Sequence, residues 1–237
     1  MTLLSVAQDV ADVIGLARPS AIVTSSDALA RQILGLARET LEELGLMDWP
    51  ILEVPYSFVT VASQAQYEMP DDFGREVGDT LYVASQYQSL RGSLTPGDWQ
   101  RQRTGLQANT GRYRFRLFGL PLMLNMTPTP TIAETLVMEY QTTYRVRQQD
   151  GTYQDTFYAD DDVSLLPEEL LKKGLKWRLR RAKGLDYSEE FNDYEVSRAQ
   201  RLAQALSMGS MPVAFRFGYE SGEGIGNVYM PETGFGN

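Results

Sequence analysis

The chain opens with two segments in which apolar residues recur at every third or fourth position, as they do on one face of a helix. The apolar face of the first segment consists of Leu3, Val6, Val10, Val13 and Ile14. Gly15 and Pro19 end this run. The second segment begins with Ser25 or Ser26 as its N-cap and ends at Gly45. The face of the second segment consists of Leu29, Ile33, Ala37, Leu41 and Leu44. The spacing predicts helices near residues 2–16 and 26–45 that pack in a core.

From Trp49 onward the period changes to two, which is typical of half-buried strands. The segments LEVPYSFVTVA and QYEM predict a hairpin with its turn at Ser63-Gln64-Ala65. Further strands are expected in DTLYVAS, GRYRFRLFG, PLMLNM and ETLVMEYQTTYRVR, with the arginines at 112, 114 and 116 on one side of the second of these. LTPGDWQRQRT predicts a short helix capped by Thr95 and anchored by Trp99. Because the links are short, the strands of residues 52–147 are expected to form an antiparallel sheet.

Helical spacing returns near residues 167–183 and 188–207. The predicted apolar faces consist of Leu171, Leu175, Leu179 and Ala182 in the first helix, and of Phe191, Ala199, Leu202 and Leu206 in the second. Beyond Met208 the chain is rich in glycine and loses its periodicity. The order of elements predicts an α+β fold, in which two N-terminal and two C-terminal helices form a four-helix bundle around an inserted antiparallel β-sheet module, followed by an extended C-terminal arm. The expected parts are residues 1–48, 49–150, 151–208 and 209–237.

Composition narrows the chemistry of the 237-residue chain. It has no cysteine and no histidine, so disulfides, thiolate nucleophiles, imidazole bases and His-ligated metals are excluded. Its net charge of −9 disfavours a general affinity for nucleic acid. The N-terminal segment carries acids where an export signal carries bases, and no stretch has the ~20 apolar residues of a membrane span. We therefore expect a soluble protein made in a cytoplasm, without a membrane partner.

Two charged clusters offer alternatives to a structural role. Asp160, Asp161 and Asp162 are the best candidate for carboxylate chemistry, either with a hard cation or as a sheet-based carbohydrate-binding or hydrolase module that uses Asp160 and Asp162. We favour helix-start electrostatics or a solvated loop, and expect that replacing all three by asparagine leaves assembly intact. The glycines of GEGIG at 222–226 are not followed by a helix, which excludes a dinucleotide loop. No enzyme, cofactor or metal is therefore expected.

The basic helix 172–183 is the second cluster, and it supports a nucleic-acid-binding alternative. Acidic segments lie at 39–43 and 189–195, so pairing of charges within or between subunits is the favoured interpretation.

Several of these segments, in this order, resemble the head-to-tail adaptor (connector) proteins of tailed bacteriophages. SSDALARQILGLARETLEEL resembles the second helix of the family, MDWPILEV its tryptophan-bearing link, TVASQAQYEMPDDF its hairpin and LTPGDWQRQ its short central element. The segment from YADDDVS to AQRLAQAL resembles the closing helix pair. The resemblance covers most of residues 2–208 and depends on the order of the segments, because none of them is a catalytic motif.

The resemblance implies a virion protein of the neck or tail connector, assembled in the host bacterial cytoplasm. Such adaptors form a homo-oligomeric ring, commonly of about twelve subunits, whose contacts are heterologous. The ring lies under the portal protein, extends the DNA channel without sequence-specific binding, and provides a platform for a downstream tail or nozzle protein. The expected subunit-interface residues are Lys172, Lys176, Arg180 and Lys183. The expected portal-binding arm contains Phe215, Phe217, Tyr219, Ile225, Val228, Tyr229, Met230 and Phe235.

Overall fold

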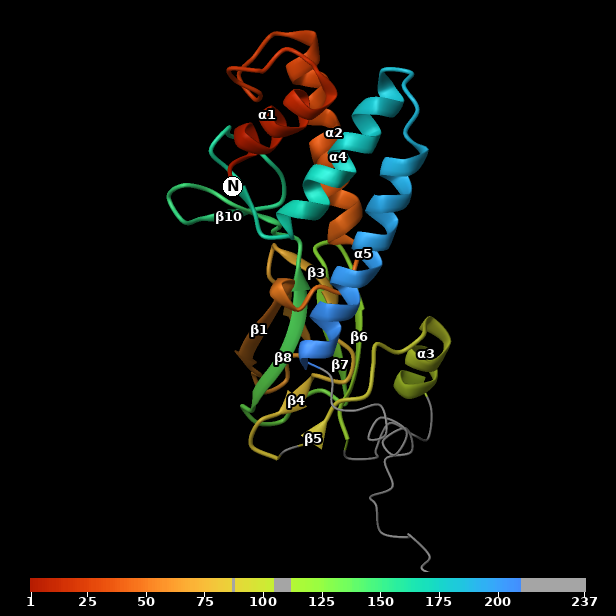
Figure 1. Cartoon of the computed structure of the whole chain (residues 1–237). Helices are drawn as coiled ribbons and strands as arrows, with labels where there is room; N and C mark the ends of the chain where they lie inside the picture. Colours follow the sequence, from red (N-terminus) through yellow and green to blue (C-terminus); the bar gives the residue numbers. More distant parts are fainter. Residues whose placement is uncertain (87, 105–111, 210–237) are drawn as a thin grey trace, which may run out of the picture.

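A computed structural model describes residues 1–86, 88–104 and 112–209 of the chain. Two bodies are stacked on one another, a helical body and a β module, and the long helix α5 runs from the first down to the second (Figure 1). Each body has its own hydrophobic core. The fold is α+β with antiparallel sheets, as the periodicity predicted.

The helical body contains α1 (Leu3–Ile14), α2 (Ala28–Gly45), α4 (Glu168–Ala182) and α5 (Ser188–Gly209). Helix α4 is central, because it packs against α1, α2 and α5. Its buried Leu171, Leu175 and Leu179 confirm most of the predicted face, although Ala182 is exposed. N- and C-terminal helices therefore share one core, although a long stretch of sequence separates them.

Local sequence explains where the first two helices begin and end. Thr2 caps α1 by accepting a hydrogen bond from the Ser5 backbone N–H, and Gly15 ends the helix in the left-handed conformation with φ of 77°. Helix α2 begins after Asp27 rather than after Ser25 or Ser26, since the Ser25 hydroxyl accepts from the Asp27 N–H.

Helix α4 approaches its neighbours closely at Gly174. A Cβ at this position would overlap the methyl group of Thr40 on α2 and would lie 3.1 Å from the ring of Tyr194 on α5. Glycine is therefore required here by packing and not by an unusual backbone conformation.

The predicted apolar face of α5 is wrong in most of its positions. Phe191 and Leu206 are 41% and 44% exposed, whereas Tyr194 is fully buried and Ser197 is nearly so. The buried face of α5 is thus rotated from the predicted one. Among the predicted residues, Leu202 does pack against the core. In α1, Val13 is likewise exposed and Ala7 and Ala11 are buried in its place. Small residues supply these contacts because the helices lie close together.

The β module contains two sheets that face one another across a shared core. The first sheet has the order β1 (Glu53–Val59), β8 (Thr135–Thr142), β4 (Tyr82–Val83) and β5 (Gln88–Ser89), with β3 (Phe73–Glu76) also paired to β8. The second has the order β2 (Gln66–Glu68), β7 (Met123–Thr127) and β6 (Arg114–Phe118). Inward-facing residues of both sheets, such as Leu136 and Leu124, form the core, so their outer faces point in opposite directions.

The predicted hairpin at Ser63-Gln64-Ala65 is wrong. Strand β1 pairs with β8, whereas β2 pairs with β7 and belongs to the other sheet. The segment between them is a connection from one sheet to the other, and the buried Tyr67 hydroxyl fixes it by donating to the Gln64 carbonyl oxygen at 2.8 Å. The single predicted sheet is therefore two sheets in this module.

A third sheet of β9 (Val146–Arg147), β10 (Tyr153–Gln154) and β11 (Val163–Ser164) lies beside α1 in the helical body. The short helix α3 (Pro96–Thr104) flanks the β module, with Trp99 buried against Phe118 as the sequence predicted for an anchor. Between the bodies the chain passes through the 3-10 turn η1 (Pro50–Leu52) on one side and the end of β8 on the other. These two crossings are neighbours, because Glu53 and Gln141 are register partners.

Candidate functional site

The aspartates at 160–162 hold the backbone of the loop before α4. One oxygen of Asp162 accepts hydrogen bonds from the Tyr158 and Ala159 N–H groups at 2.7 and 2.8 Å and from the Gln154 amide at 2.6 Å. Asp160 accepts from the N–H groups of Ile22 and Val23 at 3.0 and 2.8 Å. These two carboxylates thus fasten the loop and the α1–α2 connection together.

This geometry corrects the expected explanation of the cluster. Helix α4 begins only at Glu168, so the acids do not stabilise its start, and Asp162 is 1% exposed rather than solvated. Asp161 is exposed. Replacing all three by asparagine is therefore expected to weaken the fold, contrary to the silent outcome predicted from the sequence. Over the described ranges, no group of three or more acidic residues is arranged to hold a metal ion.

The basic residues of α4 mostly have partners in the same chain. Lys172 lies 2.7 Å from Asp9 and 2.8 Å from Glu168, and these hydrogen bonds raise the pKa of its ammonium group. Lys176 and Arg180 both pair with Glu190 of α5, at 3.5 and 2.8 Å. Lys183 is exposed at the C-terminal end of the helix. Pairing within the subunit therefore accounts for three of the four residues predicted to lie at a subunit interface.

A partly buried ionic cluster in the middle of the helical body was not predicted from the sequence. Arg178 of α4 is 5% exposed, pairs with Glu43 of α2, and lies 4.4 Å above the ring of Trp177. The other oxygen of Glu43 accepts from Arg198 at 2.7 Å and from the Tyr194 hydroxyl at 3.1 Å. Burial and the nearby Glu43 carboxylate raise the pKa of Tyr194 to about 12. The cluster joins α2, α4 and α5, and its only sequence signal was an arginine within the leucine face of α4.

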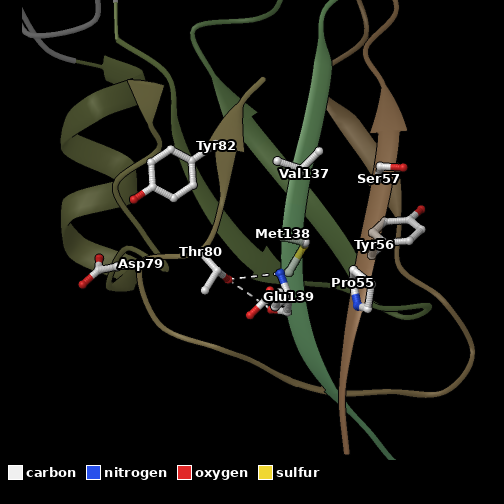
Figure 2. Close-up of a pocket in the computed structure, with 9 residues that line it drawn as sticks. All are labelled: Pro55, Tyr56, Ser57, Asp79, Thr80, Tyr82, Val137, Met138 and Glu139. Carbon is white, nitrogen blue, oxygen red and sulfur yellow. Dashed lines mark hydrogen bonds between the residues drawn. The ribbon is translucent and has the colours of Figure 1, made fainter. Parts of the chain in front are cut away.

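The outer face of the first sheet has an open groove of 690 Å³ (Figure 2). Its floor and walls come from β1, β8 and the segment leading into β4. Pro55, Tyr82 and Val137 supply exposed apolar surface, and Asp79 and Glu139 place carboxylates at its edge. Neither acid forms an ion pair within the described part of the chain. The groove is therefore a surface suited to a partner with an apolar and cationic face.

The outer face of the second sheet is basic. Arg114 and Arg116 alternate along β6 with Phe115 and Leu117, as predicted. The backbone of Arg91 pairs with that of Arg114 in an isolated parallel β-bridge. Beside them, a cavity of 280 Å³ between α3 and the sheet is lined by Arg103.

Comparison with known proteins assigns the chain to a class. The chain matches the SU10 adaptor protein family over residues 1–214 and belongs to this family. The members of this family are structural adaptors of phages and not enzymes. The family implies a component of the virion that assembles with portal and tail proteins. A search of curated proteins gives no match.

Two further predictions concern the surroundings of the protein. The eight aromatic and aliphatic residues of the predicted portal-binding arm, from Phe215 to Phe235, lie outside the described residues. Within the described part of the chain, every helix is too short or too polar to cross a bilayer.

Proposed function

We propose that the protein is the head-to-tail adaptor of a tailed bacteriophage, forming a closed ring beneath the portal. The ring would extend the DNA channel and provide the platform for a downstream tail or nozzle protein. The observation that carries this proposal is the family match, which spans the helical body and the whole β module rather than one motif. The net charge of −9 suits a channel wall along which DNA slides without sequence-specific binding.

In this proposal the four helices act as one bundle that forms the wall of the ring. Lys172, Lys176, Arg180 and Lys183 lie on α4 and at its end, and each is proposed to contribute to the contact with a neighbouring subunit. Because the first three already have partners in their own chain, each further pair would contribute only ~0–1 kcal/mol. The free energy of ring closure must then come mainly from other surfaces.

The arm of residues 209–237 is proposed to bind the portal through its apolar side chains. Burial of each large side chain contributes ~1.5–3 kcal/mol, against ~1–2 kcal/mol for each backbone unit that becomes ordered. Deleting residues 218–237 leaves every described residue in place. We expect the truncated protein to fold and to lose attachment to the portal; attachment with unchanged affinity would refute the role of the arm.

The test of the ring is the mass of the particle formed by the full chain, measured by mass photometry with and without portal protein. A discrete particle of many subunits in the presence of portal is the expected result. A chain that stays monomeric with portal at micromolar concentration would refute the proposal.

The residues on which the two alternative functions depended form contacts within the chain. One oxygen of Asp160 and one of Asp162 accept hydrogen bonds from backbone N–H groups, which supports a structural role for both residues over hydrolysis or sugar binding. Most cations of the helix 172–183 are paired within the chain, which weakens a nucleic-acid face.

A further inference from the structure

The charge of the β module is divided between its two sheets. Residues 88–130 contain six arginines and a single acid, Asp98, in a chain whose net charge is −9. They include β5 of the first sheet, the helix α3, and the strands β6 and β7 of the second sheet. The arginines of β6 share the outer face of the second sheet with one exposed acid, Glu68 on β2. A local excess of arginine in an acidic protein indicates a surface that meets an anionic partner.

Four of these arginines form one connected surface, which we call the arginine surface: Arg91, Arg103, Arg114 and Arg116. None of the four forms an ion pair with a residue that the structure describes. Arg116 lies 4.7 Å above the ring of Phe118, which orients its guanidinium group.

Two nitrogen atoms at this surface lack an acceptor. The Nε atom of Arg114 and the Nε1 atom of Trp99 are buried and have no hydrogen-bond partner among the described residues. Trp99 is 4% exposed and lines the cavity beside Arg103. Buried donors are normally satisfied, so these two leave unused hydrogen-bonding capacity beneath the arginine surface.

The groove on the opposite sheet has the complementary properties. Tyr82 and Val137 are 40% and 36% exposed within it, and Asp79 and Glu139 leave their carboxylates at its edge (Figure 2). Asp79 also faces Glu76, whose pKa is raised by burial and further by this neighbouring charge, while a hydrogen bond from Ser93 opposes the shift. Glu76 itself does not line the groove, but its repulsion with Asp79 would be offset by a cation placed at the edge of the groove.

We propose that the arginine surface of one subunit docks against the acidic groove of the next copy of the same chain. This inference rests on the proposed ring. The two faces lie on opposite sides of one β sandwich, so a single rotation repeated around an axis brings the first face of each subunit to the second face of its neighbour. Arg114 and Arg116 meet Glu139 and Asp79, and the apolar part of the groove accepts the half-buried ring of Phe118. A duplex of nucleic acid would satisfy the arginines but would leave the matching acidic groove unexplained.

Cross-linking tests this contact directly, because the chain has no cysteine of its own. The full chain carrying both Arg116→Cys and Glu139→Cys is assembled with portal and oxidised. The two cysteines of one subunit lie on opposite sheets, so disulfides can form only between subunits, and we expect a ladder of covalent oligomers on a non-reducing gel. The matched control is a chain with Arg116→Cys and Arg147→Cys, since Arg147 is exposed on β9, outside the proposed interface. An equal yield of ladder in both variants overturns the proposal.

Charge reversal provides a second measurement in the same assembly assay. Arg114→Glu with Arg116→Glu, or Asp79→Arg with Glu139→Arg, is expected to raise the concentration of half-maximal assembly by about tenfold or more, because like charges then face one another. Combining all four changes in one chain restores the pairing and is expected to bring this concentration back to within about threefold of the wild type. No rescue, or no effect of the single-face reversals, overturns the contact even if the wild-type ring forms. If the wild type forms no ring with portal, the proposed function fails as well. If the arginine reversals abolish only the binding of a labelled DNA duplex, the surface contacts DNA and not a second copy.

Discussion

The strongest prediction concerns Asp162, the buried carboxylate that fastens the loop before α4. In Asp162→Ala, the N–H groups of Tyr158 and Ala159 and the amide of Gln154 lose a common acceptor oxygen that lies within 2.6–2.8 Å of each. A buried donor left unpaired costs ~1–3 kcal/mol, so two backbone donors and one amide together predict a loss of about 3–5 kcal/mol. Because a domain is stable by only ~5–15 kcal/mol, a loss of this size is a large fraction of its total stability.

The assay is urea denaturation of the full chain, followed by tryptophan fluorescence. Trp49 and Trp177 report on the helical body and Trp99 on the β module, so far-UV circular dichroism is recorded in parallel to detect separate transitions. Asp162→Asn keeps one acceptor oxygen and is expected to cost less, about 1–2 kcal/mol. Asp161→Asn is the matched control, since Asp161 is exposed, and should change stability by no more than ~0.5 kcal/mol. A cost for Asp162→Ala below about 1 kcal/mol, or equal to that of the control, would refute the structural role of the carboxylate.

Three further predictions test the helical body by the same denaturation assay. Gly174→Ala forces overlap between helices and should cost about 1–3 kcal/mol, whereas Gly35→Ala, which meets open space on α2, should stabilise the protein by up to ~1 kcal/mol; equal effects would refute the close approach. Glu43→Ala removes the closer of the two acidic partners of buried Arg178 and leaves Glu39 at 3.4 Å, so it should cost about 2–4 kcal/mol, whereas exposed Glu42→Ala should stay within ~0.5 kcal/mol. The raised pKa of Tyr194 means that the fold favours the neutral phenol, so this stabilisation is complete below pH 10 and is lost as the pH rises to about 12. Tyr194→Phe should remove part of that alkaline loss, and an unchanged slope between pH 10 and 12 would contradict the assignment.

The sequence predicted the elements of this fold better than it predicted their partners. The spacing of Ile33, Ala37, Leu41 and Leu44 identified the buried face of α2, and all four residues are in the core. Strand segments were also located, because alternation is a local property. The partner of β1 is nevertheless β8, more than seventy positions away at register pairs such as Val59 and Thr135, and no local pattern specifies such a pair.

The candidate sites were harder to predict because burial decides their chemistry. Asp162 and Arg178 stand among similar charged residues in the sequence, yet they are 1% and 5% exposed in the structure. Which acid or base of a cluster turns inward depends on the neighbouring helices and loops, which are distant in the sequence. The arginine row of β6 was visible from the sequence, but the acidic groove opposite it required the assembled sandwich.

The side-by-side position of Glu53 and Gln141 has a consequence for how such proteins diversify. Nearly the whole β module enters and leaves the helical body through two adjacent chain segments, so its removal or exchange leaves the ends of the helical body already close together. Closing a gap of this kind costs little entropy, and an inserted segment can therefore change in length and composition while α1, α2, α4 and α5 keep their packing. Recombination between phages could thus supply a different module, while the part of the subunit built from helices is inherited unchanged.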